Sequence, residues 1–305
     1  FYKAIIKQCM VTKIKKIIVI LTILGGMLVF ADAKSDFEGA IQMIRDNKVT
    51  DAVKALDKLS KGRDADYATK SNIVLGDYYL SQNDLVKGES YYKKALGDKS
   101  KVNPDTISAA LKIGNLYLYQ GKNDQAGEYF EWANTATGDK EVRILEVLGT
   151  YYYRIDRKDL AESKFLKGAQ AAPNDIPIRL TLIEFYELKG DTTNANKYFR
   201  EIQKLNPEFK YSTLGTYFAQ TGNNDLAIKY LTRSQQSEKD PYADYVLGAI
   251  YYNQGMDAER KGDAATAKSL KDKGVKSLES ASKKGVKDAT DALAVALCHH
   301  YQTSS

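Results

Sequence analysis

The amino-acid sequence predicts an all-α protein built from about seven consecutive helix pairs and closed by a C-terminal helix. Small and aromatic residues recur at a period of about 34 residues, which is typical of helical repeat proteins. Within each period, apolar residues follow one another at intervals of three and four, the spacing of one helix face. All five prolines fall between the periods, where they interrupt no helix interior.

The first helix of each pair contains a small residue followed three positions later by an aromatic residue. A residue without a bulky side chain lets two helices approach closely, and the ring fills the space beside the crossing. The small positions are Gly76, Gly114, Gly149, Gly215 and Gly248, with Ile183 as the exception. The aromatic positions are Tyr79, Tyr117, Tyr152, Tyr186, Phe218 and Tyr251. We therefore predict that these positions form the core between the helices.

The second helix of each pair carries a similar pattern after a turn such as Lys189-Gly190-Asp191. A small residue comes first, and a bulky residue follows four positions later. The small residues are Gly88, Ala126, Ala161, Ala195 and Ala227, and the bulky ones are Tyr92, Phe130, Phe165, Phe199 and Leu231. Both sets are assigned to the core, because four residues make about one turn of a helix.

The segment from Val142 to Asp175 carries the pattern in one continuous stretch, at Leu148, Gly149, Tyr152, Ala161, Phe165 and Pro173. This pattern resembles the tetratricopeptide repeat family, in particular its exported bacterial members. The resemblance extends over nearly the whole chain after residue 33. It implies a right-handed superhelical solenoid, in which each pair buries its apolar face against the next.

The period divides the chain into seven units, which we expect at residues 34–66, 67–104, 105–138, 139–173, 174–207, 208–241 and 242–285. The last unit is stretched, because its second small residue, Gly274, comes later than in the other units. We interpret this as a lengthening of each of its two helices by about two turns. This lysine-rich extension is either a docking projection or an ordinary solvated end of the stack. Residues 286–305 are predicted to form a capping helix and tail.

The first 33 residues have the composition of a leader. Lys13, Lys15 and Lys16 precede an apolar run over residues 17–30, and Ala31-Asp32-Ala33 follows. This order predicts a secretory signal peptide over residues 10–33 that is cleaved after Ala33. A retained membrane anchor is the alternative, although the run is shorter than a span requires. Residues 1–9 precede Met10 and are interpreted as an upstream artefact.

The composition argues against nucleic acid and against catalysis. The formal net charge is +6, but much of the excess lies in the leader, so the rest of the chain has no strong positive field. The two histidines, His299 and His300, are adjacent and point in different directions on a helix. No phosphate-binding glycine loop occurs. We therefore expect no enzyme activity, no cofactor and no metal site, and we expect the unpaired Cys298 to be buried.

The resemblance implies that the first helices line a groove that binds a protein or an extended peptide. Carried over by position, it gives the candidate partner-binding residues Asn115, Tyr119, Tyr153, Arg154, Glu184, Tyr245 and Tyr252. With the leader, it predicts a scaffold in the periplasm or cell envelope, with no membrane span after cleavage and a possible place in an envelope assembly. The alternative is a module for cell-wall or surface glycan, in which exposed tyrosines stack on sugar rings.

Overall fold

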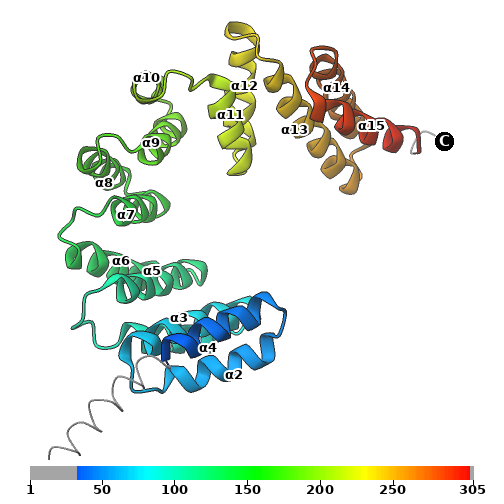
Figure 1. The fold of residues 1–305 in the computed structure, drawn as a ribbon. Helices are drawn as coiled ribbons and strands as arrows, with labels where there is room; N and C mark the ends of the chain where they lie inside the picture. Colours follow the sequence, from blue (N-terminus) through cyan, green and yellow to red (C-terminus); the bar gives the residue numbers. More distant parts are fainter. Residues whose placement is uncertain (1–32, 303–305) are drawn as a thin grey trace, which may run out of the picture. The chain divides into compact units, whose positions relative to one another are not determined.

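A computed structural model describes residues 33–302, with the side chains of residues 33–297. The described residues are helices joined by short turns, without a strand among them (Figure 1). This confirms the predicted all-α repeat fold. The predicted signal peptide, except Ala33, and the segment 1–9 lie outside the described residues.

Helical residues 33–45 are followed by helices that pack in consecutive pairs (Figure 1). They are α2 (Val49–Ser60), α3 (Ala65–Ser81), α4 (Leu85–Leu96), α5 (Pro104–Tyr119), α6 (Asn123–Ala136), α7 (Val142–Arg154), α8 (Lys158–Ala171), α9 (Ile176–Lys189), α10 (Thr192–Leu205), α11 (Tyr211–Gln220), α12 (Asn224–Ser237), α13 (Pro241–Arg260), α14 (Ala264–Lys283) and α15 (Lys287–Gln302). The helices form two compact units, one up to Ala171 and one from Ala172. We refer to them as the N-terminal and C-terminal units.

Polar caps and prolines set where several helices begin. The Asp64 carboxylate accepts hydrogen bonds from the first amides of α3, and Asn103 forms a capping box with Thr106 at the start of α5. Pro104 and Pro241 are the first residues of α5 and α13. The prolines between units therefore include residues that begin helices, because the first turn needs no intrahelical N–H donor.

The predicted small and bulky positions meet across each pair. A Cβ atom added to Gly114 would lie 2.5 Å from the Phe130 ring, and one on Gly149 would lie 2.5 Å from the Phe165 ring. Both phenyl rings are buried, with exposed fractions of 0% and 3%. Real side chains do not approach so closely. The glycines are therefore needed for the packing of the two helices.

The two helices of the fifth pair pack without a glycine at the small position. Its small position is occupied by Ile183, which is fully buried, and the facing Phe199 is also buried. The Phe199 ring stacks on Tyr211 with centroids 4.3 Å apart and contacts Phe209 at 5.8 Å. Here the phenyl ring therefore packs against residues at the beginning of the next pair.

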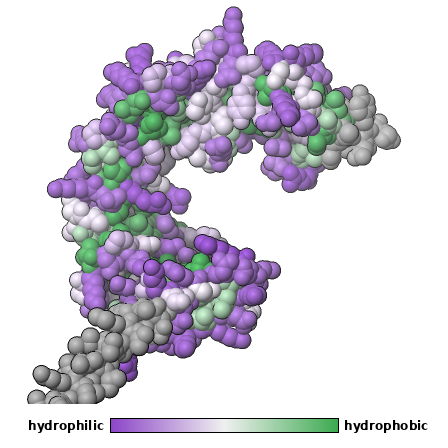
Figure 2. All heavy atoms as spheres, viewed as in Figure 1, coloured by the Kyte–Doolittle hydropathy of each residue, from purple (hydrophilic) through white to green (hydrophobic). Residues whose placement is uncertain are grey.

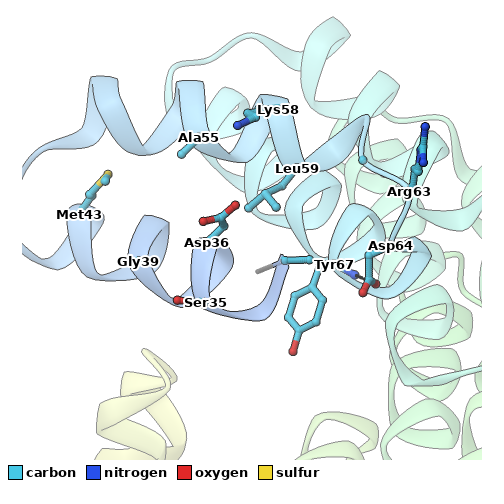
Figure 3. A pocket seen from close by; sticks show the side chains of 12 residues that line it. Ser35, Asp36, Gly39, Met43, Ala55, Lys58, Leu59, Arg63, Asp64 and Tyr67 are labelled. Atoms are coloured by element: carbon cyan, nitrogen blue, oxygen red, sulfur yellow. Dashed lines mark hydrogen bonds between the residues drawn. The ribbon is translucent and has the colours of Figure 1, made fainter. Parts of the chain in front are cut away.

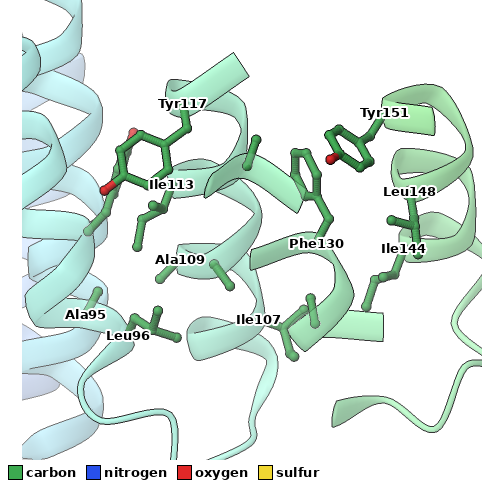
Figure 4. Close-up of a cluster of buried hydrophobic side chains, with 14 residues drawn as sticks. Ala95, Leu96, Ile107, Ala109, Ile113, Tyr117, Phe130, Ile144, Leu148 and Tyr151 are labelled. Carbon is green, nitrogen blue, oxygen red and sulfur yellow. The ribbon is translucent and has the colours of Figure 1, made fainter. Parts of the chain in front are cut away.

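A continuous apolar core crosses neighbouring pairs in the N-terminal unit. Buried residues of α4 to α7 form one cluster, in which the Phe130 and Tyr151 rings lie 5.5 Å apart (Figure 4). Leu96, Ile113 and Leu148 belong to the same cluster. Each pair thus buries its apolar face against the next, as a helical repeat requires.

Tyrosine hydroxyl groups add a second set of contacts between pairs. The Tyr117 hydroxyl donates to Glu89 at 2.8 Å, and the Tyr91 hydroxyl donates to Asp57 at 3.2 Å. Burial, with the hydrogen bond to Asp57, raises the pKa of Tyr91 to about 12. Much of the unusual tyrosine content therefore serves the fold.

Two of the predicted core aromatics keep a partly exposed edge. Tyr79 and Tyr152 are half-buried, whereas the equivalent Tyr117 is buried. The Tyr152 hydroxyl donates to Glu131 on the preceding helix. The remaining predicted core residues, from Gly76 and Ala126 to Ala161, Ala195, Ala227 and Gly248, are buried.

The last pair is longer than the others, since α13 and α14 have 20 residues each. Lys271 on α14 is 4% exposed at its side chain and lies 2.7 Å from Glu259. This lysine therefore belongs to the packing between the helices and not to a basic surface. None of the described helices has the length and apolar character needed to cross a membrane.

The terminal helix α15 packs on α14 through small residues. Ala289 and Ala296 are buried, while Ala292, Leu293 and Leu297 are half-buried. The side chain of Cys298, which the sequence predicts to be buried, lies outside the described side chains.

Candidate functional site

Exposed side chains gather on the first helices of the N-terminal unit. Tyr119, on the last turn of α5, is 75% exposed. Asn115 on the same helix and Arg154 at the end of α7 are also exposed, whereas Tyr153 is half-buried. Tyr119 and Arg154 occupy equivalent positions of successive pairs, each five residues after the packing glycine. These four candidates therefore lie on the first helices of two successive pairs.

The three candidates in the C-terminal unit are more engaged with the fold. Glu184 is half-buried and accepts a hydrogen bond from Asn223 at 3.2 Å. The Tyr252 hydroxyl donates to the carbonyl oxygen of Ala296 at 3.1 Å, which ties α13 to α15. Tyr245 packs its ring against Tyr242, with centroids 5.5 Å apart. Of these three, Tyr245 has the fewest polar contacts with other described residues.

A cavity of about 300 Å³ opens between α11 and α13 of the C-terminal unit. Apolar side chains such as Val246 and Ile250 form part of its lining, and side-chain amides surround them. Thr216 also lines it, and its hydroxyl oxygen is buried without a hydrogen-bond partner among the described residues. The cavity is therefore a place where polar groups of the protein remain available to a ligand.

A larger cavity, of about 580 Å³, lies at the first helix pair (Figure 3). Met43, Leu59 and Tyr67 contribute its apolar lining, and Asp36 and Lys58 are also part of its wall. Ala33, the first described residue, lines it too. The residues before Ala33 lie outside the described part of the chain, so no role is assigned to this cavity.

The kind of repeat follows from these features and from comparison with known sequences. The tetratricopeptide repeat family matches residues 111–176, which include α6, α7 and α8 and the second half of α5. These residues therefore form repeats of the tetratricopeptide type. This confirms the resemblance carried by the small and aromatic positions.

Several known proteins are distantly similar to this chain. Anaphase-promoting complex subunit CDC16 of Saccharomyces cerevisiae is 24% identical over 184 residues, which are 57% of this chain and 21% of the yeast protein. A tetratricopeptide repeat protein of Parabacteroides merdae has a TM-score of 0.43 and 16% identity, over 75% of this chain and 98% of that one. PilF of Pseudomonas aeruginosa has a TM-score of 0.48 and 15% identity, over 68% and 92% of the two chains.

Several rings of these repeats are already covered by other side chains. Tyr79 and Tyr91 stack with centroids 5.3 Å apart and an interplanar angle of 3°. The Lys87 ammonium lies 4.9 Å from the Tyr79 centroid, and the Lys94 ammonium lies 4.5 Å from the Tyr91 centroid. Because rings and lysines occupy these faces, this tyrosine pair is a poor platform for a sugar ring.

The described repeats contain no cluster of side chains suited to a metal ion. No group of three or more His, Cys, Asp or Glu side chains in the described part of the chain could hold a metal ion. The side chains of His299 and His300 lie outside that part. The carboxyl groups with lowered pKa include helix caps such as Asp191 and Asp263, whose hydrogen bonds from first-turn groups lower the pKa.

The repeat positions also contain residues that the sequence analysis did not select. Thr216, Gln220, Asn224 and Gln254 line the cavity between α11 and α13. Thr216 and Gln220 occupy the same places relative to Gly215 that the groove positions take relative to Gly114 and Gly149. Applying the register to the sixth repeat would have found them. Asn224 and Gln254 become neighbours only in the folded chain.

Proposed function

We propose that this chain is a non-enzymatic scaffold whose first helices bind an extended segment of a partner protein. The observation that carries the proposal is the exposure of Tyr119 and Arg154 at equivalent positions of successive repeats. Tyrosine and arginine contribute strongly at protein interfaces, because they combine large area with specific donors. A tyrosine that is 75% exposed on a rigid helix supports this use.

The mechanism is preorganisation of the binding side chains. Tyr119 lies on α5, which is held by the buried pair of Gly114 and Phe130 and by the cluster around it. A rigid helix holds its exposed side chains in place before the partner arrives, so binding orders mainly the partner segment. The visible face of both units is largely hydrophilic, with apolar residues in separate patches (Figure 2). Recognition on such a surface depends on a few side chains that the helices hold in position.

Site-specific photocrosslinking tests the proposed surface. A benzophenone amino acid replaces Tyr119 on α5 in one variant and the exposed Glu128 on α6 in a matched control. In the cells that produce the protein, we expect the residue at 119 to crosslink one protein partner and the residue at 128 to crosslink none. Tyr119→Ala combined with Arg154→Ala should weaken capture of that partner at least about tenfold. Equal crosslinking at both sites, or unchanged capture, would overturn the proposal.

We further propose that the scaffold works outside the cytoplasm, in the cell envelope, as part of a larger assembly. The support is the order of residues 13–33: lysines, an apolar run and a small-residue cleavage motif. Mass spectrometry of the protein isolated from its own cells should find Lys34 as the mature N-terminus. A protein that keeps residues 17–30 and sediments with membranes would instead support the anchor.

A further inference from the structure

The junction between the fifth and sixth helix pairs differs from the other junctions inside the two units. At those junctions one helix packs closely along the next, as α4 does on α5, α6 on α7 and α12 on α13. In the described chain, neither α9 nor α10 packs in this way along α11 or α12. Residues 206–210 join α10 to α11. The two pairs are therefore connected by this segment and by side chains, and not by interlocked helix surfaces.

Each of the two pairs is held firmly within itself. In the fifth pair, the buried Arg179 guanidinium on α9 lies 3.1 Å from the Glu201 carboxylate on α10. In the sixth pair, the main-chain N–H groups of Tyr211 and Ser212 donate to the Glu238 carboxylate at 2.8 and 3.3 Å. These bonds fix the beginning of α11 to the end of α12. A change of angle between the pairs would therefore be concentrated in residues 206–210.

Flat aromatic faces meet across this junction. The Phe199 ring of α10 stacks on the Tyr211 ring with centroids 4.3 Å apart and an interplanar angle of 8°. The Tyr211 ring lies in turn 6.1 Å from the Tyr230 ring of α12. Aromatic pairs are stable over a range of offsets and tilts, whereas interdigitated ridges of two helices fix the angle between them. The stacked rings therefore allow the pairs to turn while they stay in contact.

A buried carboxylate links the two pairs in the arrangement that the structure shows. The Glu187 side chain on α9 is 5% exposed and accepts hydrogen bonds from the Lys229 ammonium and the Tyr230 hydroxyl, both on α12. A buried carboxylate without partners is strongly unfavourable, so these bonds hold α9 and α12 together. Two further hydrogen bonds cross the junction, from Asn223 to Glu184 at 3.2 Å and from Arg233 to Asn196 at 2.9 Å.

We propose that residues 206–210 form a hinge and that Glu187 is the latch that holds it closed. In the closed state Glu187 is bonded to Lys229 and Tyr230. In the open state water solvates the carboxylate and the ammonium group, and the stacked rings slide. Residues at the ends of helices absorb the change of backbone dihedral angles in such hinges. The turn changes the angle between the first helices α9 and α11, whichever partner the protein binds.

Distance measurements by electron paramagnetic resonance test the hinge. Two nitroxide labels on the full chain replace the exposed residues Thr193 on α10 and Gln236 on α12, on the two sides of the junction. In the matched control the labels are at Gln236 and at the exposed Lys276 on α14, across helices that pack closely. Cys9 and Cys298 are replaced by serine in both proteins. We expect the distance distribution across the junction to be at least about twice as broad as the control.

Glu187→Ala tests the latch in the same two labelled proteins. It should broaden the distribution across the junction further, by about 1.5-fold or more, and leave the control distribution unchanged. The matched substitution is Glu201→Ala, which removes a carboxylate that pairs within the fifth pair, and it should change neither distribution. Circular dichroism verifies that both variants keep their helical content. Equally narrow distributions in the protein that retains Glu187 would rule out the hinge, and equal broadening by the two variants would rule out the latch.

Discussion

Replacing Phe130 with alanine is expected to lower the free energy of unfolding of the N-terminal unit by about 3–5 kcal/mol. The Phe130 ring is fully buried, fills the space left by Gly114 and contacts Tyr151 of the next repeat (Figure 4). Its removal creates a cavity at the junction of two repeats. Because stability in a repeat protein depends on contacts between neighbouring repeats, the substitution should destabilise the repeats on both sides of the junction. Urea unfolding followed by circular dichroism measures the change.

A double-mutant cycle shows whether the loss arises from the predicted contact. Gly114→Ala alone should destabilise the unit, since the added Cβ would lie 2.5 Å from the Phe130 ring. The same change should cost less when Phe130 is also replaced by leucine, and the difference measures the coupling. Glu128→Ala, on the exposed face of the same helix, should change stability by no more than about 0.5 kcal/mol. If Phe130→Ala unfolds like the wild type, the ring is not part of this core.

Replacing Asp244 with alanine is expected to lower the free energy of unfolding of the C-terminal unit by about 2 kcal/mol. This buried carboxylate on α13 accepts a hydrogen bond from Gln235 on α12. It also accepts from Ser280 at 2.8 Å and from Lys284 at 2.6 Å, at the end of α14. The substitution leaves the half-buried Gln235 and Ser280 side chains without this partner. Chemical denaturation of the full chain would measure the loss.

The effect of Asp244 should depend on pH. Burial raises the pKa of this carboxyl, but hydrogen bonds from Lys284, Gln235 and Ser280 outweigh it, so the pKa lies below its ordinary value of 3.8. A lowered folded pKa means that the stabilisation is present above about pH 4 and is lost as the pH falls through the folded pKa. The difference between wild type and Asp244→Ala should therefore shrink in acid.

The matched control for Asp244 is Asp257→Asn. The Asp257 side chain is 60% exposed and pairs with Arg260 at 2.8 Å on the same helix. Such exposed pairs contribute at most about 1 kcal/mol. An equal loss of stability in the two variants would show that Asp244 is not a special contact between helices. A difference that stays constant down to pH 2 would contradict the assigned charge.

The repeat register was predictable because Gly76, Gly114, Gly149 and Gly215 each face a bulky partner sixteen residues further along the chain. Gly149 and Phe165 could be paired from the sequence, and the structure places them in contact. The sequence also showed that Ile183 replaces the glycine of the fifth pair, but it did not show how the helices accommodate this larger side chain. Where the Phe199 ring packs depends on Tyr211 of the next repeat, and sequence spacing does not determine that contact.

The candidate surface was predictable only in part. Its position on the first helices follows from the register, and Tyr119 is exposed as expected. Tyr252 is also a predicted groove residue, four residues after Gly248, yet its hydroxyl is engaged by Ala296, more than forty residues further along the chain. The sequence alone cannot distinguish a tyrosine available to a partner from one that ties two helices together, because both lie on the first helix of a pair, just after the packing glycine.

By itself, the amino-acid sequence determined that this protein is a stack of α-helical pairs and where the pairs meet, since helix period and side-chain size are local properties. Only the tertiary structure decided which polar groups are left without partners, as at Thr216. Hydrogen bonds such as those of Asp244 join residues from different helices. Whether a polar group is satisfied or available therefore depends on how the helices pack, and repeat spacing does not record it.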